Sequence, residues 1–164
     1  MNIWLAAVAA VLVQPLVFVA RLAPDYIVSP GPLYGIGFAL VAVVVVAAAA
    51  VLLLGVPTFL VLRRFHRLSW VSLAIAGVML GALPAVFSWP RVLEGYSAGQ
   101  SWHGRYVDTY INGLPSPYAW LIYGEGVAFF ALHGLVGALV FYVVWRARVR
   151  PYSSFKPKPL RDSA

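Results

Sequence analysis

The sequence contains no cysteine, and only 10% of its 164 residues are charged. Without cysteine the chain can form no disulfide and no iron–sulfur cluster, and it offers no thiol nucleophile and no thiolate ligand for zinc. So little charge argues against an ordinary soluble domain, in which about 25% of residues are charged and about 45–50% are apolar. Disorder is excluded for all but a short tail, because disordered chains are rich in charge and poor in hydrophobic residues.

Standard catalytic motifs are also missing. The sequence has no GxxxxGK phosphate loop, no HExxH zinc motif, no complete dinucleotide fingerprint and no GxSxG elbow. Its histidines, His66, His103 and His133, fall on the inner side, on the outer side and at mid-membrane in the topology derived below, so they cannot surround one ion. We therefore expect a non-enzymatic protein without a metal or another cofactor.

Hydrophobic residues make up 62% of the chain, more than a 17.8 kDa globule can bury. A helix needs about 20 mostly apolar residues to cross the hydrocarbon core, and four stretches qualify, at residues 3–20, 34–62, 68–89 and 119–145. The first stretch lacks a positive n-region, so it is interpreted as a retained span rather than a cleaved signal peptide. The sequence predicts an all-α, polytopic membrane protein, with a four-helix transmembrane bundle over residues 1–149 in contact with the lipid bilayer, and a basic tail over 150–164.

The basic residues indicate the orientation of this bundle. Nine of the twelve lysines and arginines fall in the link 63–67 and in the segment 146–164, whereas three arginines share the other side with three acids. Lysine and arginine in short loops mark the cytoplasmic side of a membrane. We therefore expect both termini in the cytoplasm, and the loops 21–33 and 90–118 on the outer face of a cell inner membrane.

The net charge of +7 follows from this bias and does not indicate a nucleic-acid partner, for which basic residues would cluster on a soluble face. Basic side chains beside a bilayer contact anionic headgroups, and each such contact is worth about 1 kcal/mol. The arginines predicted to make this contact are Arg63, Arg64, Arg67, Arg146, Arg148 and Arg150.

Glu125 is the one acidic residue inside a predicted span, about two helical turns from the outer end of that span. Ionisable residues within a membrane are costly and are functional hypotheses by default. His133 lies on the same broad face, so the two side chains could form a proton or ion path. In the structural alternative, Glu125 pairs with Arg91 or Arg105 near headgroup water, and His133 bonds to a backbone carbonyl or to Gln14.

Small residues recur along the fourth predicted span, where they allow close helix packing without help from the hydrophobic effect. They are Gly124, Gly126, Ala128, Ala131, Gly134, Gly137 and Ala138. Packing within the bundle is favoured over dimerisation, and it would turn Glu125 and His133 inward.

The outer loop 90–118 combines aromatic and charged residues. Residues 106–111 alternate with period two, which is typical of a strand, and Asn112-Gly113 is a strong tight-turn signal. We expect a small β-hairpin over the outer end of the bundle. Because loops on a rigid scaffold often carry binding function, this loop is either a recognition patch or a cover for the helix ends. The residues predicted for such a patch are Trp102, His103, Arg105, Tyr106, Asp108 and Tyr110.

Residues 34–146 resemble the uncharacterised four-span inner-membrane proteins that are common in proteobacteria. The segments that carry this resemblance are GVPTFL at 55–60 leading into Arg63-Arg64, GALP at 81–84, INGLP at 111–115 and GLVGALVF at 134–141. The resemblance implies a fold and a location in the inner membrane, and it implies no activity.

The function favoured by the sequence is that of a non-enzymatic inner-membrane protein that acts by contact with a protein partner at the outer face. One concrete form is a membrane immunity protein, which would bind an arriving toxin through the loop 90–118. The alternative is a small ion or proton channel or transporter, or a subunit of one, that uses Glu125 and His133. A membrane enzyme is a third and less favoured class, because no catalytic set converges.

Overall fold

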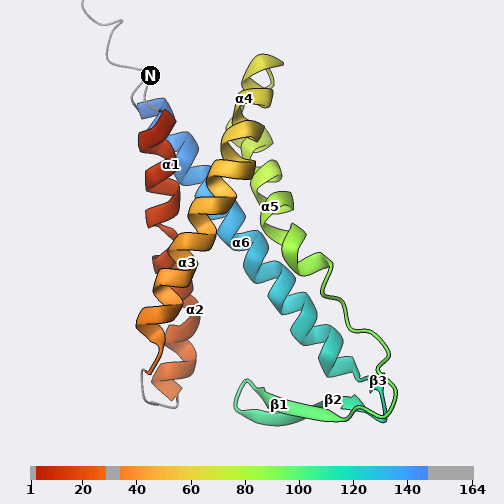
Figure 1. The fold of residues 1–164 in the computed structure, drawn as a ribbon. Coiled ribbons are helices and arrows are strands. Elements are labelled where there is room, and N and C mark those ends of the chain that lie inside the picture. The colour runs from red at the N-terminus through yellow and green to blue at the C-terminus, as the bar shows by residue number, and fades with distance from the viewer. Residues whose placement is uncertain (1–2, 29–33, 148–164) are drawn as a thin grey trace, which may run out of the picture.

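The computed structural model describes residues 3–28 and 34–147, and it is mostly helical with a small antiparallel sheet (Figure 1). The helical elements are α1 (Ile3–Leu12), α2 (Gln14–Val28), α3 (Ile36–Ala50), the π-helical turn η1 (Val51–Gly55), α4 (Val56–Arg64), α5 (Trp70–Val86) and α6 (Pro117–Ala147). The strands are β1 (Ala98–Trp102), β2 (Arg105–Ile111) and β3 (Leu114–Pro115). The basic tail 150–164, with Arg148 and Arg150, lies outside the described residues.

Within the described residues, three helical segments are long and apolar enough to cross a membrane: Ile3–Ala23, Ile36–Arg64 and Pro117–Ala147. They confirm three of the predicted spans and identify a multi-pass membrane protein. The remaining span was predicted too long, because α5 has 17 residues and rises only about 25 Å. Its start is set by a capping box, in which the side chains of Ser69 and Ser72 bond reciprocally to backbone N–H groups.

The first predicted span was expected to end at residue 20, but the chain stays helical as far as Val28. A single turn residue, Val13, interrupts the helix between α1 and α2. Arg21 therefore lies inside a helix and not in the predicted loop 21–33. The helix tolerates this charge because the guanidinium group finds a carboxylate partner on α6.

The second span forms one long helix (Figure 1), and the turn at η1 is wider than an α-helical turn. In the π-helical turn η1, the backbone N–H of Val56 bonds to the carbonyl of Val51, five residues back. Pro57 follows directly, and its ring would crowd the carbonyl four residues before it in a regular α-helix. The wider turn accommodates the proline without ending the span.

Glycines bring α5 and α6 into backbone contact. A methyl group added at Gly77 would lie 2.5 Å from the carbonyl oxygen of Gly134, and one added at Gly134 would collide with the carbonyl oxygen of Gly77. Gly81 contacts the backbone of α6 in the same way, at Phe130. Gly134 of the fourth predicted span therefore serves packing within this chain, as the sequence predicted, whereas a methyl group added at Gly124 or Gly126 would meet nothing within 4 Å.

Aromatic side chains build the hydrophobic core near the arginine-rich end of the helices. Phe59 of α4 is fully buried, and its ring centroid lies 5.0 Å from that of Phe141 and 5.3 Å from that of Trp145. Three alanines of α1, namely Ala6, Ala7 and Ala10, let that helix approach this cluster closely. The core therefore joins α1, α4 and α6.

The outer loop contains two consecutive hairpins rather than the single one predicted, with strand order β1-β2-β3. The predicted turn at Asn112-Gly113 is confirmed, because both residues have positive φ, as a two-residue type I′ connection requires. His103 and Gly104 make a second turn of the same kind between β1 and β2. Strand β1 was not predicted, since its sequence AGQSW has no β-branched residue.

The elements alternate between two ends of the molecule. Figure 1 shows the start of α1, the end of α4, the start of α5 and the end of α6 at one end, and the sheet at the opposite end with the end of α2. We call the first the basic end, because it carries the exposed residues Arg63, Arg64, Arg67 and Arg146. The other is the sheet end.

Candidate functional site

Glu125 is the centre of a polar cluster at the sheet end. Its Oε1 pairs with the guanidinium group of Arg21 on α2. Its Oε2 accepts a hydrogen bond of 2.8 Å from the indole N–H of Trp102, and Nε2 of His103 lies 3.4 Å from the same oxygen. One carboxylate thus joins two helices and the tip of the first hairpin.

The hairpin reaches Glu125 because its turn directs the neighbouring side chains of Trp102 and His103 toward the carboxylate. Trp102 ends β1, and His103 follows with a φ of +48°, in the left-handed region. Their ring centroids are 4.7 Å apart, and the indole also meets the ring of Tyr118 at 5.8 Å. The first turn of α6 and the hairpin tip therefore pack as one unit around the carboxylate.

The charge of Glu125 was expected to be buried, but 31% of its side chain is exposed, and so is 38% of the side chain of Arg21. Neither of its two anticipated partners makes the ion pair. The guanidinium group of Arg91 instead stacks over the ring of Trp89, 4.8 Å from the centroid, and Arg105 is exposed beside the hairpin turn. Both carboxylate oxygens are engaged, so the arrangement suits a structural tie between helices and sheet.

Arg21 is the site residue that sequence reasoning missed. It is a single cation within an apolar segment, and it lies about two helical turns from the sheet end of its helix, as Glu125 does. Opposite charges at equal depth in a membrane tend to pair, since isolated charges are costly there. The similar depth of Arg21 and Glu125 was therefore the feature of the sequence that could have indicated this pair.

The rest of the predicted recognition patch faces away from Glu125. Tyr106, Asp108 and Tyr110 of β2 line a shallow pocket of about 340 Å³ together with residues 97–99 and Ile111. Tyr106 is 74% exposed, whereas the ring of Tyr110 packs against that of Tyr96 with centroids 5.3 Å apart. The structure therefore divides the patch: Trp102 and His103 hold the hairpin, Tyr110 packs against Tyr96, and Tyr106 and Asp108 are exposed.

His133 and Gln14 form a separate polar pair deep between the helices. Nδ1 of His133 lies 2.5 Å from Oε1 of Gln14, and Nε2 of Gln14 donates to the carbonyls of Ala10 at 3.0 Å and of His133 at 3.2 Å. Gly137 leaves room for this amide, because a methyl group there would lie 2.8 Å from Nε2 of Gln14. The predicted bond between His133 and Gln14 is confirmed.

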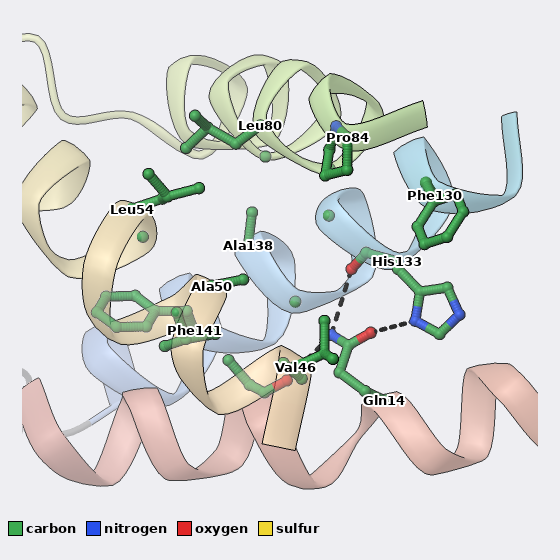
Figure 2. Close-up of a pocket in the computed structure, with 18 of the residues that line it drawn as sticks. Gln14, Val46, Ala50, Leu54, Leu80, Pro84, Phe130, His133, Ala138 and Phe141 are labelled. Atoms are coloured by element: carbon green, nitrogen blue, oxygen red, sulfur yellow. Dashed lines mark hydrogen bonds between the residues drawn. The ribbon is translucent and has the colours of Figure 1, made fainter. Parts of the chain in front are cut away.

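A cavity of about 450 Å³ surrounds this polar pair. Figure 2 shows Gln14 and His133 at its edge, with α3 and η1 on one side and α5 on the other. All four apolar helical segments contribute residues to the lining, and its polar side chains are those of Gln14, Thr58 and His133. Glu125 does not line the cavity, so Glu125 and His133 have different partners and different surroundings.

Within residues 3–28 and 34–147, no group of three or more histidines, aspartates or glutamates is placed to hold a metal ion. Comparisons with protein-family models, with curated protein sequences and with solved structures found no match.

Proposed function

We propose that the chain crosses a cell inner membrane four times, with its basic end in the cytoplasm and its sheet outside. The alternation of the helices between two ends supports an even number of crossings (Figure 1). The excess of arginine at the basic end supports the orientation. The short helix α5 makes the third crossing in contact with α6, and a local thinning of the bilayer compensates for its length.

On this topology, the protein acts by contact with a protein partner at the outer face and catalyses no reaction. The observation that carries the proposal is the division of the loop 90–118: Trp102 and His103 contact Glu125, whereas Tyr106, Asp108 and Tyr110 line a separate pocket. On the proposed topology this pocket faces the aqueous side. Tyrosine is enriched at protein interfaces, because it offers a large apolar surface with one polar group. A rigidly held tyrosine surface fits this role.

Site-specific photo-crosslinking in native membranes tests the proposal. A photoreactive residue placed at Tyr106 is expected to give a discrete adduct with one protein. Val92 provides the matched control, because it is also exposed, at 64%, and follows α5 at the same end of the molecule. Identical adducts at both positions, or none at either, would contradict a specific partner on β2.

One concrete form of this function is immunity to a toxin that arrives from outside. In that form, Tyr106→Ala together with Asp108→Ala abolishes protection of cells, while Val92→Ala leaves it unchanged. Full protection by the double variant, at an equal amount of protein in the membrane, would exclude this form.

The alternative function, an ion or proton path through Glu125 and His133, has less support. Glu125 bonds to Arg21 and the hairpin, whereas His133 bonds to Gln14. Flux measurements in liposomes test it, with an unchanged leak expected in Glu125→Gln and in His133→Ala. A leak that disappears in both variants would favour the channel over the contact function.

A further inference from the structure

The cavity between α3 and α5 is not used by the proposed contact function, and it combines an apolar wall with one oriented polar pair. Its volume of about 450 Å³ falls in the range of small-molecule sites, about 300–1,000 Å³. Gln14 is buried at its edge beside Gly137. An apolar cavity with a few positioned polar groups is the usual form of a ligand site.

Hydrogen bonds determine which way the amide of Gln14 points. Its nitrogen lies within bonding distance of two backbone carbonyls, of Ala10 and His133, and these oxygens only accept. The amide oxygen must then be the atom that faces Nδ1 of His133, at 2.5 Å. Because an amide oxygen also only accepts, Nδ1 carries the hydrogen and donates it.

This arrangement leaves the second ring nitrogen of His133 as a hydrogen-bond acceptor. With its hydrogen on Nδ1, the neutral imidazole has a lone pair on Nε2, and no hydrogen bond to Nε2 is formed within the described residues. Figure 2 shows this nitrogen on the side of the ring away from Gln14. An acceptor without a donor is unfavourable in apolar surroundings.

We propose that the cavity binds a lipid-soluble molecule with a hydroxyl group, which donates its hydrogen to Nε2 of His133 while its apolar body lies between α3 and α5. The hydroxyl supplies the donor that the ring lacks. A ligand with only carbonyl or ether oxygens would bring a second acceptor to the same place, so the site selects alcohols or phenols over their ethers.

The ligand enters from the bilayer rather than from the outer aqueous side. Phe18 and Phe129 line the cavity, and they stand one helical turn from Arg21 and Glu125 respectively. The ion pair and the hairpin tip therefore lie beyond the cavity at the sheet end. In contrast, α3 and α5 diverge toward that end (Figure 1), and residues of both helices line the cavity.

Competition against a photoreactive alkylphenol tests the proposal with the full chain in lipid nanodiscs. The two competitors are 4-hexylphenol and its methyl ether 4-hexylanisole, which differ in the single donor hydrogen. The phenol is expected to compete about tenfold better, which corresponds to one hydrogen bond of about 1.4 kcal/mol. In His133→Phe this preference should vanish while labelling persists, because a phenyl ring keeps the apolar wall and has no acceptor.

A second pair of competitors, farnesol and its methyl ether, distinguishes the source of the hydroxyl. A stronger preference for the phenol assigns the site to phenolic ligands such as quinols, and a stronger preference for farnesol assigns it to aliphatic lipid alcohols. Either preference supports the proposal. Equal competition by each alcohol and its ether, or labels that map outside the cavity, would overturn it.

A substitution that fills the cavity tests the proposal without changing Gln14 or His133. Ala50 lines the cavity (Figure 2), so Ala50→Phe should fill it and reduce labelling at least tenfold. Val41 lies on the same helix, is exposed and does not line the cavity, so Val41→Phe should label normally. Equal labelling of these two variants would also overturn the proposal, even if His133→Phe did not fold.

Discussion

Trp102 donates its indole N–H to Oε2 of Glu125 across 2.8 Å, and this bond fastens the end of a strand to a membrane-spanning helix. Arg21 holds the other carboxylate oxygen from a second helix. The position of the sheet therefore depends on a carboxylate that α6 carries.

Replacement of Trp102 by phenylalanine should loosen the first hairpin. The change removes the indole N–H and keeps an aromatic ring, so the main loss is a hydrogen bond to a charged group, worth about 1–2 kcal/mol at a partly exposed site. Backbone amides of β1 and β2 should exchange with deuterium several-fold faster. The control is Trp120→Phe, because Trp120 is exposed and makes no hydrogen bond within the described residues; equal acceleration in both variants would exclude a specific role for the indole.

A double-mutant cycle should reveal coupling between Arg21 and Glu125. The variants Arg21→Gln and Glu125→Gln each remove one charge, and in the double variant neither charge is left without its partner. Because both side chains are about one-third exposed, we expect a coupling of about 1 kcal/mol in thermal unfolding in detergent. Strictly additive single effects would show that the ion pair does not stabilise the protein.

Alanine at Gly77 should separate α5 from α6. The added methyl group would lie 2.5 Å from the carbonyl oxygen of Gly134, and the backbone must shift to relieve this overlap. We expect a loss of about 1–3 kcal/mol, measured as a lower Tm in detergent. Gly126 is the control, since nothing lies within 4 Å of a methyl group there. Gly126→Ala should be neutral or stabilising, because alanine favours helix by up to about 1 kcal/mol; a similar loss in both variants would contradict the close approach.

The two hairpin turns should respond differently to alanine. Gly104 and Gly113 both have positive φ, at 77° and 84°, so alanine at either position costs about 1–2 kcal/mol of backbone strain. At Gly113 the methyl group would also lie 2.5 Å from the carbonyl oxygen of Leu93, whereas it meets open space at Gly104. Gly113→Ala should therefore accelerate amide exchange in β2 more than Gly104→Ala; the opposite order would contradict this packing.

Much of the fold could be predicted because lipid restricts the possibilities. A chain in hydrocarbon must satisfy its backbone hydrogen bonds within each helix, so an apolar stretch of sufficient length predicts a span directly. The turn at Asn112-Gly113 was predictable for a similar local reason, since these two residue types tolerate positive φ. Strand β1 was missed because its sequence AGQSW carries no local preference, and it is held by hydrogen bonds to β2.

The sequence identified three residues of the candidate sites, but it did not show which residue each of them contacts. Glu125, His133 and Gln14 stood out because polar groups are costly inside a membrane. The pairing of Glu125 with Arg21 joins residues 104 positions apart, and it depends on how α2 meets α6. Two alternatives with Arg91 and Arg105 were equally consistent with the sequence.

The sequence by itself determined that the protein lies in a membrane, where three of its spans run and that Glu125, His133 and Gln14 require polar partners, because each of these follows from local composition and from the free energy of burying polar groups. Only the tertiary structure decided that Glu125 holds the hairpin through Trp102, and that Gln14 orients His133 beside a cavity. A polar side chain in apolar surroundings is costly without a hydrogen-bond partner, and the packing of the helices decides which partner lies close enough.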